Sequence, residues 1–177
     1  MNLLRPVGAE AAVWRLGGGH CASMVAWRSG QTALGGCVVI GVDVGGTKIA
    51  AAAVARDCSL SGAVSLPTPK DGQALLDAVA DAVRQVTAAT GAAHVVGVGL
   101  PSLIEQPAGV VRATANADLA NVDALGELTR RIGVPVVLDN DGNLAAIAEH
   151  AVGAGVGTAN VLSLIHISEP TRRTPIS

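Results

Sequence analysis

Residues 41–48 read Gly41-Val42-Asp43-Val44-Gly45-Gly46-Thr47-Lys48 and join two apolar runs that are typical of strands, Val38–Ile40 and Ile49–Val54. A strand that ends near an aspartate and is followed by two glycines and Thr-Lys predicts a tight hairpin whose backbone N–H groups can face an anion. We expect the glycines to adopt positive φ and to let phosphate oxygens approach the backbone. Thr47 would add a hydroxyl donor, Lys48 a point charge and Asp43 a carboxylate for a metal-bound water. The alternative is an ordinary Gly-Gly turn with a solvated lysine.

Composition narrows the class of protein. Half of the 177 residues are hydrophobic, but only 1% are aromatic, and Phe and Tyr are absent. A core of Val, Leu, Ile and Ala suits an α/β sheet and argues against a binder that stacks nucleic-acid bases. The net charge of −2 gives no electrostatic footprint for DNA or a membrane, and no apolar run is long enough for a membrane span. Three cysteines without metal-ligand spacing indicate free thiols in a reducing, cytoplasmic setting.

The order of apolar runs predicts three antiparallel strands followed by β-α-β units, which form a mixed sheet covered by helices. Residues 57–62 read as a turn before the third strand, and Gly91 and Gly133 read as the ends of the first two helices. The predicted strands are Val38–Val42, Ile49–Ala55, Ala63–Leu66, His94–Val98 and Val134–Leu138, and the predicted helices are Gln73–Thr90, Val122–Ile132 and Leu144–Val152.

A second polar cluster, Asp139-Asn140-Asp141-Gly142-Asn143, directly follows the last predicted strand. In open α/β sheets, ligands bind beyond the carboxyl ends of strands, where Asp43 is also expected. Asn140, Asp141 and Asn143 can hydrogen-bond several hydroxyls of a sugar, and Asp141 is placed to accept a proton from an attacking hydroxyl. An ordinary aspartate is a weak base near pH 7, but in phosphoryl transfer positioning and charge neutralisation supply most of the acceleration. The alternative is that these residues are N-caps of the next helix.

Both clusters, in this order and on these elements, resemble the ROK family of bacterial sugar kinases and sugar-responsive repressors, and its glucokinase-type members in particular. The resemblance covers residues 38–161 and implies the N-terminal lobe of an actin-like (ribonuclease H-like) ATPase fold, with the second lobe missing. Residues 41–48 resemble the first phosphate loop of that family. The resemblance implies that Mg²⁺ bridges phosphate oxygens near Asp43 and that ATP phosphates are bound by Asp43, Gly45, Gly46, Thr47 and Lys48.

The sugar site is implied by two further matches. Residues 97–102 resemble the family's Gly-x-Gly-x-Pro-Gly loop, although Ser102 replaces the final glycine. Asn140-Asp141 matches the pair that grips the sugar and supplies the catalytic base, whereas Gly142 stands where the family usually has alanine. The resemblance thus implies Asp141 as the catalytic residue and a set of sugar contacts that consists of Gly99, Pro101, Ser102, Asn116, Asn140, Asp141 and Glu149. It places no metal ligand in this chain and a structural Zn²⁺ only in the missing lobe.

The resemblance predicts that the parent gene product phosphorylates a hexose with ATP, glucose being the favoured substrate. It also implies a cytoplasmic homodimer that acts in glycolysis. One alternative is a kinase for another sugar: an N-acetylated hexosamine, mannose or fructose. The other is a sugar-responsive transcriptional repressor, but residues 1–37 carry no basic recognition helix, and all the phosphate-loop residues are present.

The two ends of the chain have a different character. Leu162–Arg172 matches the translation of a transposon-based sequencing-library adapter, and Ile176-Ser177 continues that adapter in frame. We therefore expect residues 162–177 not to be native. Residues 1–37 lack a sustained helical or strand period, so we expect a leader with little order, or one added by a mis-assigned start codon. The family's second phosphate loop would follow Val161, so we expect this chain to be an inactive fragment.

Overall fold

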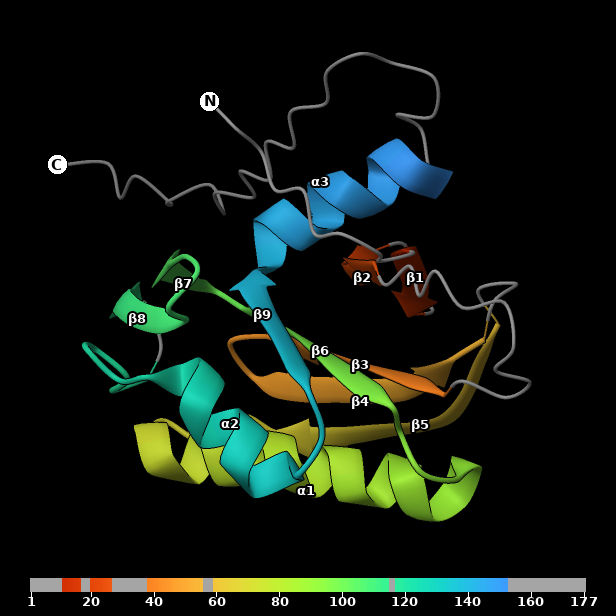
Figure 1. Cartoon of the computed structure of the whole chain (residues 1–177), viewed down its shortest axis with the longest axis horizontal. Helices are drawn as coiled ribbons and strands as arrows, with labels where there is room; N and C mark the ends of the chain where they lie inside the picture. The colour runs from red at the N-terminus through yellow and green to blue at the C-terminus, as the bar shows by residue number, and fades with distance from the viewer. Residues whose placement is uncertain (1–10, 17–19, 27–37, 56–58, 115–116, 153–177) are drawn as a thin grey trace, which may run out of the picture.

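The computed structural model describes residues 11–16, 20–26, 38–55, 59–114 and 117–152. Its centre is a five-stranded sheet in the order β5-β4-β3-β6-β9 (Figure 1). The strands β3 (Val39–Val44), β4 (Lys48–Val54) and β5 (Leu60–Pro67) form an antiparallel meander, and β6 (Val95–Leu100) and β9 (Val136–Asn140) extend it parallel to β3. The predicted mixed α/β sheet is therefore confirmed.

The helices α1 (Gly72–Thr90) and α2 (Ala124–Ile132) cover one face of this sheet (Figure 1). The predicted apolar stripe of α1 is buried, and it packs against alternate strand residues such as Val42 and Val98. Each of these side chains contributes roughly 1.5–3 kcal/mol when it leaves water. Both helices end at the predicted glycines, Gly91 and Gly133, and Gly133 has the left-handed φ of 80° that favours glycine.

Several element boundaries differ from the prediction. The turn predicted over 57–62 is wrong for its described residues from Leu60 onward, because β5 already begins there. Gly62, with φ 59°, forms a bulge where the register between β4 and β5 shifts, so the strand continues through it. The last strand begins after Pro135, not at Val134, and α2 begins after its N-cap Asp123. Gly62, Pro135 and Asp123 therefore shift the ends of elements that the apolar pattern had predicted.

The N-terminal segment also differs from the expectation of little order. The strands β1 (Ala11–Leu16) and β2 (His20–Ala26) form an antiparallel pair, and they lie with α3 (Asp141–Val152) on the sheet face opposite α1 and α2 (Figure 1). The sequences of β1 and β2, AAVWRL and HCASMVA, mix apolar residues with Arg, His and Ser and lack the continuous apolar run that marks β3 and β4. The adapter-like residues 162–177 and Asn116 lie outside the described residues. Within the described ranges, no helix has the length and apolarity that a bilayer crossing requires.

Candidate active site

The two polar clusters lie at one edge of the sheet. The strands β3, β6 and β9 are parallel neighbours, and their register places Asp43 beside Gly99 and Gly99 beside Asp139. Because neighbouring strands lie about 4.8 Å apart, the backbones of Asp43 and Asp139 are separated by roughly 10 Å, with no side chain on the glycine between them. The turn that ends at Lys48 and the start of α3 at Asp141 follow these two aspartates. The fold thus brings together two motifs that are far apart in sequence.

The turn between β3 and β4 consists of Gly45, Gly46, Thr47 and Lys48. The Gly45 N–H donates to the Lys48 carbonyl oxygen at 2.9 Å, and a Cβ on Gly45 would lie 3.1 Å from that oxygen. Positive φ is found at Gly62, Gly91, Gly109 and Gly133 but not in this turn, so the positive φ predicted for Gly45 and Gly46 is wrong. Glycine is favoured at position 45 because the Lys48 carbonyl oxygen lies close to its Cα, and not because the backbone there is left-handed. Gly46, Thr47 and Lys48 are exposed, and they carry the donors that the turn presents to solvent.

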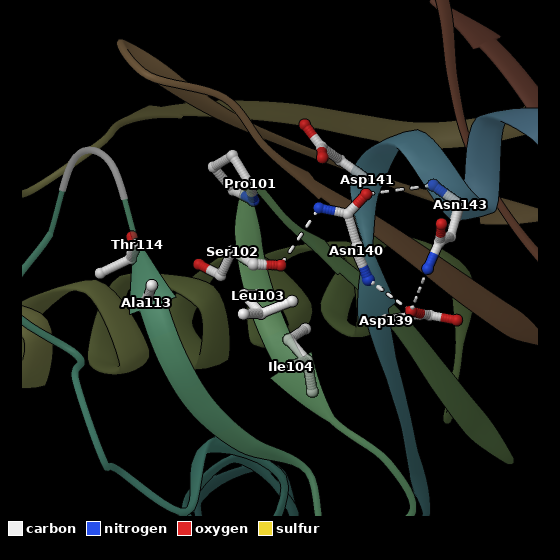
Figure 2. Close-up of a pocket in the computed structure, with 10 residues that line it drawn as sticks. All are labelled: Pro101, Ser102, Leu103, Ile104, Ala113, Thr114, Asp139, Asn140, Asp141 and Asn143. Carbon is white, nitrogen blue, oxygen red and sulfur yellow. Dashed lines mark hydrogen bonds between the residues drawn. The ribbon is translucent and has the colours of Figure 1, made fainter. Parts of the chain in front are cut away.

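The second cluster links the end of β9 to α3 through Asn140. Its Oδ1 accepts from the Asn143 N–H at 3.1 Å, which makes Asn140 the N-cap of the helix. Its Nδ2 donates to the Ser102 carbonyl oxygen at 3.1 Å, and its own N–H donates to Asp139 Oδ1 at 2.7 Å. Asn143 Nδ2 donates to the same Asp139 oxygen at 3.1 Å, and these bonds are drawn in Figure 2. The capping alternative therefore holds for Asn140.

Asp141 is the first residue of α3 and is half-buried. Its Oδ1 accepts from the Gly142 N–H at 2.8 Å, and in Figure 2 its carboxylate points away from Asp139. A carboxylate in the first turn of a helix is stabilised by the positive end of the helix dipole. A Cβ on Gly142 would lie 3.1 Å from Asn140 Oδ1, so an alanine at this position would press on the cap. The glycine at this position accommodates the bond that Asn140 makes.

A cleft of about 760 Å³ opens between the start of α3 and a hairpin that consists of β7 (Ser102–Glu105) and β8 (Val110–Thr114). This volume falls within the range of small-molecule sites, roughly 300–1,000 Å³. One wall is polar, and the other is largely apolar, with a Leu103 that is 67% exposed (Figure 2). The polar wall consists of Asp139, Asn140, Asp141 and Asn143, and the other of Pro101, Ser102, Leu103, Ile104, Ala113 and Thr114.

Only part of the predicted site lines this cleft. Pro101, Ser102, Asn140 and Asp141 do so, whereas Gly99 is buried in β6. Glu149 lies farther along α3, and within the described ranges neither it nor the Gly45–Lys48 turn lines the cleft. Asn116 is outside the described residues. The strands predicted from the sequence include none over residues 102–114, so the prediction missed the hairpin wall of Leu103, Ile104, Ala113 and Thr114.

The described residues contain no cluster of three or more His, Cys, Asp or Glu side chains that could hold a metal ion. Mg²⁺ does not require such a cluster, since it is usually held by one or two carboxylates together with substrate phosphates and water. Asp43, half-buried at the sheet edge just before the turn, is a carboxylate of that kind.

Comparisons with known proteins all indicate the same family of sugar kinases. Residues 39–168 match the ROK family. The chain is 36% identical over 128 residues to the glucokinase of Streptomyces coelicolor, which covers 72% of this chain and 40% of that protein. It is 37% identical over 111 residues to an N-acetyl-D-glucosamine kinase of Escherichia coli, which covers 62% of this chain and 36% of that protein.

A solved structure is also similar. It is the crystal structure of a ROK family glucokinase from Streptomyces griseus in complex with glucose and AMPPNP, with a TM-score of 0.64 and 32% sequence identity. The similarity covers 68% of this chain and 38% of that one, so the chain spans about 40% of the length of the relatives it matches. The likeness confirms the predicted actin-like ATPase lobe.

Proposed function

Because the chain belongs to the ROK family, we propose that the parent gene product is an ATP-dependent glucokinase that converts glucose to glucose 6-phosphate. The observation that carries this proposal is the register of Asp43, Gly99 and Asp139, which sets the phosphate turn and Asp141 at the same edge of the sheet. Asp141 lines a cleft of about 760 Å³, which has room for a hexose. Phosphorylation of a hexose in general is supported by the relatives, and glucose is the finer part of the proposal.

The proposed chemistry assigns a role to each motif. Asp141 accepts the proton of the sugar hydroxyl while the hydroxyl oxygen bonds to the γ-phosphorus of ATP. The bond between that phosphorus and the oxygen that bridges it to the β-phosphate breaks, and ADP leaves. Thr47 and Lys48 offset the charge of the transferring phosphate. Asp43 would hold Mg²⁺ through water, and the ion when bound would supply further neutralisation of the phosphate charge.

The two walls of the cleft suit a sugar. Amide and carboxylate groups on the α3 side can exchange hydrogen bonds with hydroxyls, and Leu103 and Ile104 on the hairpin offer an apolar surface to the C–H face of the ring. The identity to an N-acetyl-D-glucosamine kinase favours that sugar as the second candidate. Parallel assays with glucose, N-acetylglucosamine, mannose and fructose distinguish these substrates.

The proposal extends to the whole protein. We place the first lobe at residues 38–161 and regard residues 1–37 as a leader and residues 162–177 as non-native; the family match runs to residue 168 and overlaps the first seven residues of that tail. The parent would be a cytoplasmic homodimer, with its Zn²⁺ in the second lobe. Because this chain spans about 40% of the length of its glucokinase relative, we expect the chain alone to be inactive.

The test uses the parent protein, obtained by resequencing the locus beyond Val161. Asp141→Asn should lower kcat by about 10²–10⁴-fold, the usual contribution of a positioned base, while the Kd for glucose stays within about threefold. Asp118→Asn is the matched control, since Asp118 is an exposed aspartate outside the cleft. A near-normal rate in the Asp141 variant would show that the base is assigned to the wrong residue.

A further inference from the structure

Thr68, which directly follows β5, makes two hydrogen bonds to the phosphate turn. Its N–H donates to the Thr47 carbonyl oxygen at 3.1 Å, and its hydroxyl donates to the Gly45 carbonyl oxygen at 2.8 Å. The residue is partly buried and belongs to neither polar cluster. Both of its bonds therefore reach the backbone of a turn that is otherwise exposed.

We propose that Thr68 is a positioning residue for the nucleotide: it holds the Gly45–Lys48 turn in the conformation that receives the ATP phosphates. This inference rests on the proposed function. Two successive glycines give the turn more backbone freedom than other residues would, and that freedom must be restricted before the donors can act together. The internal bond from Gly45 N–H to Lys48 restricts the turn only at its base.

The planarity of the peptide unit explains how Thr68 acts at a distance. The Gly45 carbonyl and the Gly46 N–H belong to one peptide plane and point in opposite directions when the bond is trans. The cis bond in the described ranges is Gln106–Pro107, so this one is trans. Because the Thr68 hydroxyl fixes the Gly45 carbonyl, the Gly46 N–H is directed away from Thr68. The bond to the Thr47 carbonyl fixes a second plane of the same turn.

The chain offers a matched control for this hydroxyl. Thr90, at the end of α1, donates from its hydroxyl to the Val86 carbonyl oxygen at 2.8 Å and is also partly buried. The donor, the acceptor type and the length are the same as at Thr68, but the bond lies within a helix and outside the turn. A loss that is only structural should appear in both variants.

The experiment compares Thr68→Val, Thr68→Ser and Thr90→Val in the parent protein. Thr68→Val should raise KM for ATP by about 3- to 10-fold, the effect of one neutral hydrogen bond, and leave KM for glucose within twofold. Thr68→Ser restores the donor and should return KM for ATP to within twofold. Thr90→Val should leave both constants unchanged. If Thr68→Val does not fold, Thr68→Ala tests the same loss.

A second measurement does not depend on catalysis. Amide hydrogen exchange in the peptide that covers residues 43–49 should be faster in Thr68→Val than in Thr90→Val or the wild type. Unchanged KM for ATP, or equal rises in KM for both substrates, overturns the positioning role. Loss of the proposed function is distinguishable from this, because it would show as normal turnover in Asp141→Asn or as no phosphorylation by the wild-type parent.

Discussion

Asn140 shows how one side chain can serve structure and site together. Its oxygen caps α3 and its nitrogen holds the Ser102 carbonyl, so a single amide joins β9, β7 and the helix that carries Asp141. Aspartate would retain the cap but could not donate to Ser102, and serine is too short to reach it. An asparagine directly before Asp141 therefore has a structural role even if it does not bind a sugar. It holds β7, which forms one wall of the cleft, and it fixes the start of the helix that carries Asp141.

Glu127 gives a prediction about pH. Hydrogen bonds from Arg130 and Arg131 lower the pKa of Glu127 from 4.5 to about 2, and Arg131 also contacts Asp77 and Gln73 on α1. Because the pKa is lower in the folded state than in the unfolded state, the stabilisation is fully present above about pH 4.5 and is lost as the pH falls toward 2. Urea unfolding should therefore show that Glu127→Gln is less stable than the wild type at pH 6 and that the difference shrinks by pH 2.5.

High salt provides the control for this effect. Glu127 is near the surface, so 1 M NaCl should weaken the ion pairs and reduce the difference between variant and wild type at pH 6. A difference that stays constant from pH 6 to pH 2.5 would show that the glutamate acts through packing and not through its charge.

The helices and central strands could be predicted because their signals are local. The apolar stripe from Leu75 to Val86 fixes α1, and apolar runs with clear ends fix β3, β4 and β6. The continuation of β5 through Gly62 could not be predicted, because glycine is common both in turns and in bulges. The end of β9 at Asn140 could not be predicted either, because asparagine occurs both in loops and at helix N-caps. The cleft wall depends on contacts between distant residues, such as Gln106 with Leu138, that no local pattern records.

The hairpin of β7 and β8 leads to a prediction about sugar affinity. Gln106 Nε2 donates to the Leu138 carbonyl oxygen at 2.8 Å, so it caps the outer edge of β9 and holds the hairpin that carries Leu103. Gln106→Leu in the parent should raise KM for glucose by about 3- to 10-fold and change KM for ATP less than twofold. Thr68→Val is expected to have the opposite effect, with a raised KM for ATP and a nearly unchanged KM for glucose.

Gln85→Leu is the matched control for the hairpin variant, because Gln85 is an exposed glutamine on α1 that bonds to Asp81 at 3.2 Å. It should change neither KM. Equal rises in KM for glucose and ATP after Gln106→Leu would indicate a general loosening of the lobe, and the idea of a positioned cleft wall would be wrong.

The parallel strands β3, β6 and β9 account for the arrangement of the whole molecule. They set the Gly45–Lys48 turn and Asp141 at one sheet edge, although almost a hundred residues separate the two in sequence. The crossover helices α1 and α2 cover one face of the sheet. In the proposed enzyme, the described residues supply the Gly45–Lys48 turn to the ATP phosphates and the cleft beside Asp141 to the sugar. In the proposed enzyme the remaining nucleotide contacts come from a second lobe, so neither ligand is enclosed by this lobe alone.

The last prediction compares this chain with its parent through ligand-induced thermal stabilisation. A ligand at 100 times its Kd stabilises the state that binds it by about 2.7 kcal/mol, which for the parent corresponds to roughly 5 °C in Tm. Glucose with AMPPNP should therefore raise the Tm of the parent, and glucose alone should still do so in Asp141→Asn, because binding survives that change. The 177-residue chain should shift by less than about 1 °C at the same concentrations. An equal shift in the chain would mean that this lobe forms a complete site, and the two-lobe proposal would have to be abandoned.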